Sequence, residues 1–230
     1  MIYVYRRAPS ESATQLATVL EGKRVRTLAR LNRHIKLEPG PVVCWGEHWE
    51  GGLNGDAPIR SKFTDAVMLK GAGVTTVEVS GNQIDDGWLP RMYNHHGGND
   101  LLDPPEMPDF WVKKETLVKE YRVHWFNGRS IRAGVKVPRE GVESHRWVRS
   151  FDSGWKVLYD GFHSTNVMRR RAQKAIQALG LQFGAVDIGE KEDGKLIVRE
   201  VNRAPGLEGN TIPTYARAIR EWAKEADGDI

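Results

Sequence analysis

Alternating or continuous apolar residues divide this 230-residue chain into segments that predict β-strands. The strands are expected at residues 2–6, 42–45, 75–79, 120–126, 129–137, 145–151, 156–159, 184–188 and 196–201. Turn sequences join two pairs of these strands, Asn127-Gly128 in one case and Asp193-Gly194 in the other. Both dipeptides supply the positive φ angles of a tight hairpin turn, so two β-hairpins are expected.

Other segments place apolar residues three and four positions apart, which is the period of an α-helix. Helices are expected at residues 11–20, 166–179 and 213–226, with a short helix before the strand at 75–79. Capping residues precede the first two (Ser10 or Ser12, and Thr165 or Asn166), and Gly22 and Gly180 follow them. The mixture of helices and strands predicts an α/β or α+β fold.

Composition marks a boundary near residue 55. Residues 46–58 are rich in glycine and polar side chains, which is typical of a loop. Residues 1–55 are therefore expected to form a small βαβ unit, and residues 56–230 are expected to form the main domain.

The charge balance narrows the classes of function. The chain has 34 basic and 30 acidic side chains, and its net charge of +4 is too mild to make nucleic acid the expected partner. Basic clusters at 23–33 and 169–171 are interpreted as solvated helix faces. The eight tryptophans are spread along the chain and so do not predict one stacking platform. Trp45, Trp49 and Trp88 lie near loops and are candidates for docking an acceptor substrate.

The single cysteine, Cys44, lies in an apolar run and is expected to be a buried, unpaired side chain. One cysteine excludes a disulfide framework and suits a reducing cytoplasm. No apolar run approaches the roughly 20 residues that cross a bilayer, and the first residues lack a signal-peptide pattern. A cytoplasmic protein without membrane contact is expected.

Candidate metal ligands fall on the second predicted hairpin. Glu200 and Asn202 are two residues apart in a strand and point to the same face, and Asp187 can reach that face from the preceding strand. Two carboxylates and an amide oxygen suit Mg²⁺, which takes its other ligands from water and phosphates. The alternative is an ordinary solvent-facing hairpin with surface acids.

Asp187, then Glu200-Val201-Asn202 and Pro205-Gly206, resemble the metal-binding end of the ATP-grasp ligases. The spacing is similar to that of the D-alanine–D-alanine ligase branch. The resemblance implies an ATP-grasp fold with a reduced N-terminal unit and a small lid subdomain at about residues 81–127. It also implies ATP and two Mg²⁺ ions, with Mn²⁺ as a substitute, held by these three side chains.

Upstream segments resemble the phosphate-binding parts of the same family. Lys62 stands where the family has a lysine that contacts ATP phosphates. Arg91 ends a strand before a glycine-rich loop and stands where the family usually has lysine, so it is assigned to phosphate binding and catalysis. In that loop His96, Gly97 and Gly98 are assigned to ATP. A zinc site at His95 and His96 is a weaker alternative.

The adenine hinge and the next strand complete the resemblance. Lys113, Lys114 and Thr116 hold the hinge positions by spacing, and Glu120 matches the glutamate that binds the ribose. Arg122 resembles an arginine, found in the peptide-ligating branch (RimK-like), that lies near the transferred phosphate or the acceptor carboxylate. It is the second catalytic candidate, whereas His95, His96, His124 and His163 are candidates for a base.

The implied activity is ligation: ATP activates a carboxylate as an acyl phosphate, and an amine then displaces phosphate. The partners would be a small-molecule or peptide carboxylate and an amine, with a homodimer or partner protein completing the acceptor site. Compact chains of this kind also resemble phage-type members. An ATP-grasp kinase, or a non-catalytic nucleotide-binding assembly protein, stays open as an alternative.

Overall fold

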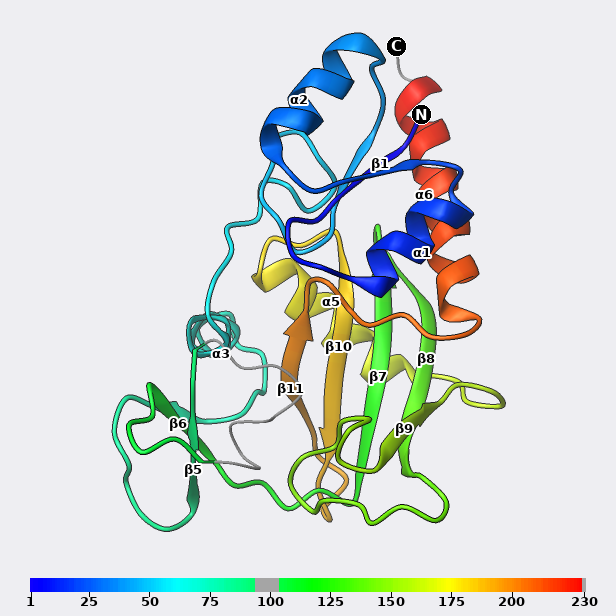
Figure 1. The fold of residues 1–230 in the computed structure, drawn as a ribbon. Helices are drawn as coiled ribbons and strands as arrows, with labels where there is room; N and C mark the ends of the chain where they lie inside the picture. Colours follow the sequence, from blue (N-terminus) through cyan, green and yellow to red (C-terminus); the bar gives the residue numbers. More distant parts are fainter. Residues whose placement is uncertain (94–103, 229–230) are drawn as a thin grey trace.

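The computed structural model describes residues 1–93 and 104–228 of the chain as a mixed α/β structure (Figure 1). The strands are β1 (Tyr3–Tyr5), β2 (Lys23–Val25), β3 (Val42–Cys44), β4 (Val79–Ser80), β5 (Trp88–Arg91), β6 (Phe110–Lys113), β7 (Lys119–Phe126), β8 (Arg129–Pro138), β9 (Trp155–Leu158), β10 (Phe183–Glu190) and β11 (Leu196–Asn202). The helices are α1 (Glu11–Val19), α2 (Leu28–Leu37), α3 (Lys62–Gly71), α5 (Asn166–Ala178) and α6 (Thr211–Gly228).

The largest sheet has five antiparallel strands in the order β11-β10-β7-β8-β9. Both predicted hairpins are present in it, and Asn127 and Gly128 have the positive φ angles (39° and 84°) that the turn requires. Successive residues of a strand face opposite sides, so Val186 and Ile188 join the core under α5. Asp187, between them, faces the other way, toward a cavity.

The face of this sheet away from α5 is only partly covered. Phe126 and Phe183, at one end of it, pack in a core with α6, α1 and the N-terminal strands. In Figure 1 this covering lies at the upper end, and the lower ends of β7, β10 and β11 are not covered by a helix on this side. The open half of the face is where a site can form.

The N-terminal unit is a three-stranded parallel sheet in the order β2-β1-β3, with α1 and α2. The expected βαβ description was incomplete, because β2 and α2 were not predicted. Both are strongly basic, and α2 buries only Leu31, so their hydrophobic pattern is weak. Serine and threonine caps are present as expected at α1 and α5, where Ser10 and Thr165 accept from backbone N–H groups.

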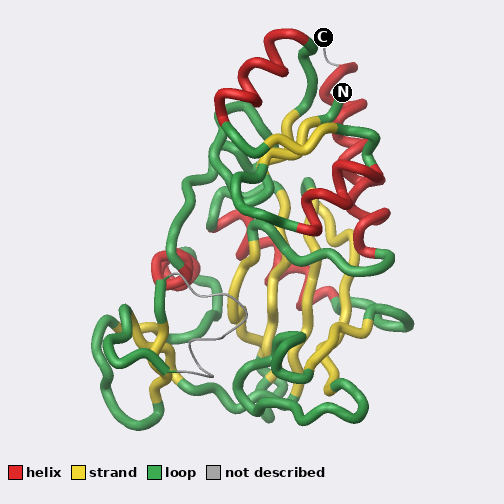
Figure 2. The backbone as a smooth tube through the Cα atoms, viewed as in Figure 1, coloured by secondary structure: helices red, strands yellow, loops and turns green. Residues whose placement is uncertain are grey.

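Two predicted strands are wrong. Residues 145–151 form a loop, visible in Figure 2 below the large sheet, in which the His145 Nδ1 accepts from the N–H groups of Trp147 and Val148. Residues 75–79 contain only the start of β4. Instead of continuing a strand, Thr76 forms a parallel bridge with Val198, at the edge of β11.

A small sheet, β4-β6-β5, lies beside α3 at the lower left of Figure 1. The bridge at Thr76 connects this part of the chain to the large sheet through two backbone hydrogen bonds. The Val77 N–H donates to the Val198 carbonyl (3.2 Å), and the Val198 N–H donates to the Thr75 carbonyl (2.8 Å). No helix of the described residues is long and apolar enough to cross a membrane.

Asn54 connects the N-terminal unit to the large sheet. It is buried and has a positive φ of 63°, a conformation that asparagine tolerates better than most residues. Its side-chain oxygen accepts from the N–H groups of Gln182 (2.6 Å) and Phe183 (3.0 Å), and its amide donates to the Phe183 carbonyl (2.8 Å). One side chain thus satisfies three backbone groups where β10 begins.

Asn54→Ala is expected to lower the free energy of unfolding by about 2–4 kcal/mol, since it leaves buried backbone groups without partners. Chemical denaturation followed by tryptophan fluorescence measures the effect. Asn82→Ala, at an exposed turn, is the control and should change stability by less than about 0.5 kcal/mol. Equal effects of the two substitutions would contradict the bridging role.

Candidate nucleotide and metal site

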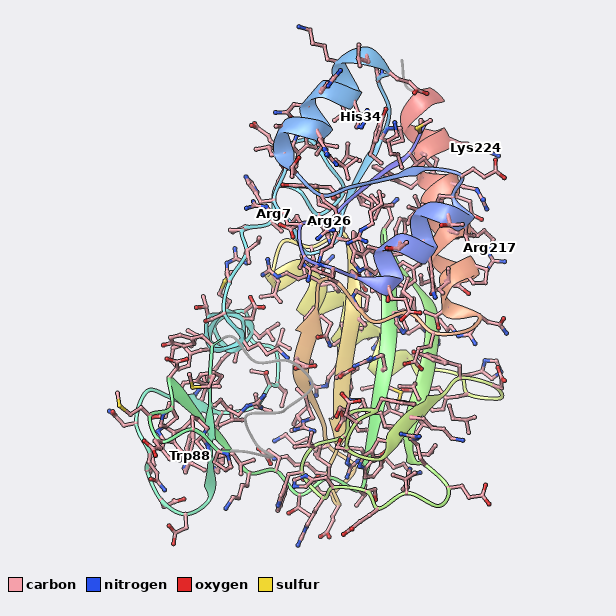
Figure 3. The ribbon with its side chains drawn as sticks, in the orientation of Figure 1. Arg7, Arg26, His34, Trp88, Arg217 and Lys224 are labelled. Carbon is pink, nitrogen blue, oxygen red and sulfur yellow. The ribbon has the colours of Figure 1, made fainter. Side chains whose placement is uncertain are left out.

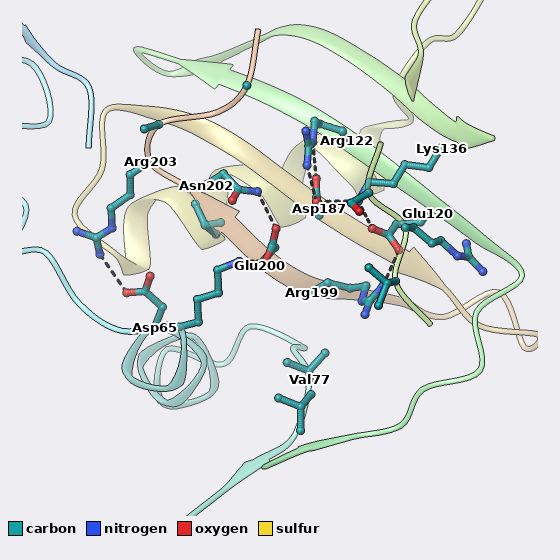
Figure 4. A pocket seen from close by; sticks show the side chains of 18 of the residues that line it. Asp65, Val77, Glu120, Arg122, Lys136, Asp187, Arg199, Glu200, Asn202 and Arg203 are labelled. Carbon is teal, nitrogen blue, oxygen red and sulfur yellow. Dashed lines mark hydrogen bonds and ion pairs between the residues drawn. The ribbon is translucent and has the colours of Figure 1, made fainter. Parts of the chain in front are cut away.

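A cavity of about 660 Å³ lies over the open half of the large sheet. Its lining comes from the sheet, the N-terminal unit, the small sheet, α3 and the loop that contains Trp147. Figure 4 shows its charged side chains, which converge from β7, β8, β10 and β11. Segments far apart in the sequence therefore meet at one concave site.

The three predicted metal ligands lie together on this face. Asp187 is the direct partner of Glu200 across β10 and β11, and Asn202 pairs with Ala185 two positions along. The Asn202 amide donates to a Glu200 carboxylate oxygen at 2.9 Å. The register, which shifts between Asp187 and Ile188, leaves Arg199 as an extra residue beside Glu200.

Asp187 is held by two cations. Arg122, its direct neighbour on β7, binds both carboxylate oxygens at 2.7 and 2.8 Å, and the Lys136 ammonium lies 2.9 Å from one of them. The Asp187 side chain is 1% exposed. Burial alone would raise the pKa of Asp187, but the charges of Arg122 and Lys136 outweigh burial and lower it to about 2. Asp187 is therefore ionised at neutral pH.

Glu200 is held by Lys62, which forms an ion pair with it from the first turn of α3. Ser61 caps this helix by accepting from the Thr64 N–H, so the cap fixes where Lys62 projects. Burial opposes the charge on Glu200, but the Lys62 ammonium and the Asn202 amide keep the pKa of Glu200 well below its usual value. Lys62 thus lies beside two of the predicted metal ligands, and its contact with ATP phosphates stays a prediction.

The donor set fits Mg²⁺. Asp187, Glu200 and Asn202 offer hard oxygen atoms on one face, and both carboxylates are ionised. In the described part of the chain, no three His, Cys, Asp or Glu side chains form a metal-binding group, so the set depends on the amide of Asn202. The cations of Lys62, Arg122 and Lys136 balance these carboxylates in the structure without a metal.

Glu120 lies deeper than a ribose contact would suggest. Its side chain is 2% exposed, and its two oxygens pair with Lys136 and, at 2.6 Å, with Arg199. Burial raises the pKa of Glu120, but these two cations lower it below the usual value. Glu120 lines the cavity, so ribose binding stays a prediction that requires one oxygen to exchange its partner.

Lys136 and Arg199 were missed by the sequence analysis. Lys136 links Glu120 to Asp187, because the register of β7 and β8 pairs Tyr121 with Val135 and so sets Lys136 beside Glu120. In the sequence, each looks like a solvated charge on a strand. Their burial and pairing became visible only in the folded sheet, and the local sequence contains no signal for them.

The predicted hinge borders a second, smaller cavity of about 60 Å³. Its lining includes Lys113 and Thr116 together with apolar side chains of Val77, Leu89, Val112, Leu117 and Trp147. Lys114 does not line it, and its N–H already donates to the Gly87 carbonyl at 2.7 Å. Charged side chains make up the other part of the lining, so adenine binding at the hinge stays a prediction.

Arg91, at the end of β5, lines both cavities. His95, His96, Gly97 and Gly98 lie outside the described residues, so their assignment to ATP stays a prediction. His124 and His163 do not line either cavity. Burial and the nearby Arg122 charge lower the pKa of His124 to about 3, so it is neutral between the hydroxyls of Tyr159 and Tyr215.

The tryptophan candidates for acceptor docking were partly wrong. Trp45 is fully buried and stacks on Phe183 at 5.2 Å, and Trp88 is also buried. Neither lines one of the two cavities described above, whereas Trp147 and Trp155 line the larger one. Cys44 is buried and unpaired as expected, and burial raises the pKa of its thiol to about 12.

The buried carboxylates predict that acid destabilises the protein. Because the pKa of Asp187 is about 2 in the folded protein and near 4 when unfolded, its stabilising effect is complete above pH 4 and is lost as pH falls toward 2. Protonation of Asp187 alone is expected to lower the free energy of unfolding by about 2 kcal/mol over that pH interval. Denaturant midpoints measured from pH 6 to pH 2 test this, and a flat profile below pH 4 would contradict it.

Comparison with solved structures finds chains with a similar fold. The ATP-grasp ligase PsnB, complexed with a minimal precursor, superposes with a TM-score of 0.65 at 12% identity, over 96% of this chain and 98% of that chain. Macrocyclase MdnC, bound with precursor peptide MdnA from Microcystis aeruginosa MRC, gives 0.61 at 11% identity, over 98% of this chain and 100% of that chain. D-alanine–D-alanine ligase from Bacillus anthracis gives 0.60 at 12% identity, over 96% and 92%.

The chain therefore has the ATP-grasp fold, as its motif spacing predicted. Two of these neighbours were solved with a bound precursor or precursor peptide, and PsnB is also known in a complex with its minimal precursor, Mg and ADP. No protein-family model matches the sequence, and no curated protein matches it.

Proposed function

We propose that this protein is an ATP- and Mg²⁺-dependent ligase that joins a carboxylate to an amine. The observation that carries the proposal is the row of Asp187, Glu200 and Asn202 on the cavity floor, with Lys62, Arg122 and Lys136 around it. Phosphoryl transfer needs positioning and charge neutralisation more than covalent help, and this cavity offers both.

The first step makes the acyl phosphate. A carboxylate oxygen of the substrate attacks the γ-phosphorus of ATP, the bond to the β-phosphate oxygen breaks, and ADP leaves. Asp187, Glu200 and Asn202 would hold Mg²⁺, which when bound supplies positive charge to the phosphate oxygens. Lys62, Arg91 and Arg122 line the cavity. Lys62 and Arg91 would bind ATP phosphates, and Arg122 would stabilise charge on the transferred group.

The second step forms the amide. The amine nitrogen attacks the acyl carbon, the bond to the phosphate oxygen breaks, and the nitrogen loses its proton to the departing phosphate or to water. An acyl phosphate hydrolyses readily, so the site has to exclude bulk water. Burial of Asp187, Glu120 and Lys136 at the cavity floor supports such an environment.

The substrates are proposed to be a peptide or small-molecule carboxylate and an amine. PsnB and MdnC were solved with a precursor or precursor peptide, and this supports a peptide as one partner. Residues 1–55 would bind the substrate as a reduced N-terminal unit, while residues 56–230 would bind ATP. The lid of the ATP-binding domain would be the subdomain near residues 81–127.

The experiment is ADP release from Mg-ATP in the presence of pooled amino acids, peptides and carboxylic acids, with mass spectrometry of the products. ADP with a new amide-linked mass is the expected result. ADP with a phosphorylated product and no need for an amine would establish a kinase instead. If no ADP forms and Mg-ATP does not stabilise the protein against heat, the proposal is overturned.

A further inference from the structure

One end of the large cavity is lined by arginines of the N-terminal unit and its surroundings. Arg6 follows β1, Gly46 follows β3, and the two lie at the carboxyl ends of parallel strands, where ligands of α/β sheets commonly bind. Arg203 directly follows the metal-ligand candidate Asn202. In Figure 4, Arg203 and Asp65 lie at the end of the pocket away from Lys136 and Arg199.

The charge of Arg6 is poorly compensated. Its side chain is 23% exposed, and the contacts of its guanidinium with described residues are long: 3.4 and 3.5 Å to the carbonyls of Trp45 and Gly46, and 3.6 Å to Glu47. Its buried Nε atom has no hydrogen-bond partner among the described residues. Glu47 is engaged more closely by Arg7, at 3.1 Å to the side chain and 3.0 Å to the backbone N–H.

Gly46 makes the position of Arg6 possible. A β-carbon at Gly46 would lie 2.8 Å from an Arg6 guanidinium nitrogen and 2.9 Å from the Ala204 methyl group. Gly46 also has a φ of +73°, which favours glycine. The absence of a side chain therefore lets the guanidinium lie close to residues 203–206, the loop after the metal ligands.

Arg60 and Arg203 add to this charge. Arg60 lines the cavity and donates only to the Leu179 carbonyl, at 3.3 Å, with no acidic partner within 4 Å in the described part of the chain. Arg203 pairs with Asp65 at 3.0 Å and donates to the Pro58 carbonyl, while its buried Nε has no hydrogen-bond partner among the residues that the structure describes. Three guanidinium groups thus line one end of the cavity, where Asp65 pairs with Arg203, Glu47 lies 3.6 Å from Arg6, and Glu208 also belongs to the lining.

We infer that Arg6, Arg60 and Arg203 form a subsite for a substrate carboxylate that does not react. The inference rests on the proposed function, because it supplies a second anchor for a substrate whose reacting group lies near Arg122. A guanidinium fork binds a carboxylate through two parallel hydrogen bonds, which suits a planar anion better than an ammonium group does. The ligase therefore selects an amino acid, or a peptide end, with a free carboxylate.

The test compares matched substrates. Each amine that supports ADP release is assayed as the free acid and as its carboxamide, and each acyl donor as the dicarboxylate and the monoamide. The free acid should be favoured by roughly 10- to 100-fold in kcat/KM, the range of one charge-assisted hydrogen bond. If only the amine substrate is preferred as its free acid, the acceptor is an amino acid or a peptide with a free carboxylate. If only the acyl donor is preferred with its second carboxylate free, the donor is a dicarboxylate.

Arg6→Gln should abolish this preference through KM, while kcat and the KM for ATP change little. Arg6→Lys should restore part of it, because the charge is kept and the fork is lost. Arg26→Gln removes the same charge from an exposed position of the same unit, labelled in Figure 3, and is the control. The subsite would be overturned if the wild type used the free acid and its carboxamide with equal kcat/KM. It would also be overturned if Arg6→Gln lowered kcat/KM for the two substrates by the same factor.

If no ligation is found, the heat stability of the protein in Mg-ADP tests the carboxylate subsite separately from the ligase reaction. Stabilisation by L-aspartate or L-glutamate, absent with their diamides and lost in Arg6→Gln, would support the subsite even though the ligase reaction fails. No stabilisation by these acids would overturn it.

Discussion

Glu200→Gln is expected to reduce ATP turnover on the order of 10³-fold while leaving the protein folded. Glutamine has nearly the same size and can still accept a hydrogen bond from Lys62, but it removes one of the two negative charges that would hold Mg²⁺. A bound metal is worth several kcal/mol of charge stabilisation in phosphoryl transfer, and this sets the magnitude. The Glu200 side chain is 30% exposed, so its packing contribution is small.

Steady-state ADP release and the Mg²⁺ dependence of nucleotide binding measure the effect of Glu200→Gln. Glu192→Gln is a matched control, because it makes the same change at the exposed turn of the same hairpin. The control should keep wild-type turnover and wild-type metal dependence. Undiminished ADP release in Glu200→Gln would show that Glu200 is not a metal ligand.

Arg122→Ala is expected to affect both stability and catalysis. Asp187 would keep Lys136 but lose the bidentate contact, and leaving a buried charge short of a partner costs about 3 kcal/mol. In the proposed reaction Arg122 would stabilise the transferred phosphoryl group, so its loss should also lower kcat by roughly 10²- to 10³-fold. The KM for ATP should change much less, because Lys62 and Arg91 remain.

Denaturation curves and a comparison of kcat with the KM for ATP separate the two effects of Arg122→Ala. Arg129→Ala, on the same hairpin, removes an exposed ion pair with Glu221 and should change stability by less than about 1 kcal/mol. Arg122→Lys keeps the charge without the fork and should recover part of kcat. A loss of ATP affinity alone would move Arg122 to the nucleotide site.

Elements with a strong local signal could be predicted from the sequence. Asn127-Gly128 and Asp193-Gly194 determined both hairpins of the large sheet, and Ser10 and Thr165 marked the helix starts. The prediction of a strand at 145–151 was wrong, because residues 147–151 form a loop that lines the cavity and pairs with no neighbouring strand of the described residues. An alternating pattern indicates which residues are buried, but it does not show whether a neighbouring strand or several other elements bury them. At residues 145–151 several elements do so.

The arrangement of the metal-ligand candidates could be predicted from the sequence, because Asp187 and Glu200 lie 13 residues apart on the two sides of one turn. The register of the sheet then brings them together. The sequence could not predict that the cavity includes Lys136, Arg199 and Arg6, because each of these side chains depends on a contact between segments distant in the sequence. Lys136 needs the β7–β8 register, Arg199 needs the extra residue beside Glu200, and Arg6 needs Gly46. Spacing along one hairpin can be read from a sequence, whereas such pairings form only on folding.

The contact of residues 75–77 with β11 also protects the protein against self-association. β11 is the last strand of its sheet, and an uncovered edge strand offers unpaired N–H and carbonyl groups to any other extended chain. The bridge at Thr76 occupies the edge at Val198, two residues before Glu200. Loosening it would expose a ready template for intermolecular strand pairing beside the large cavity, so variants in this segment should aggregate before they lose their secondary structure.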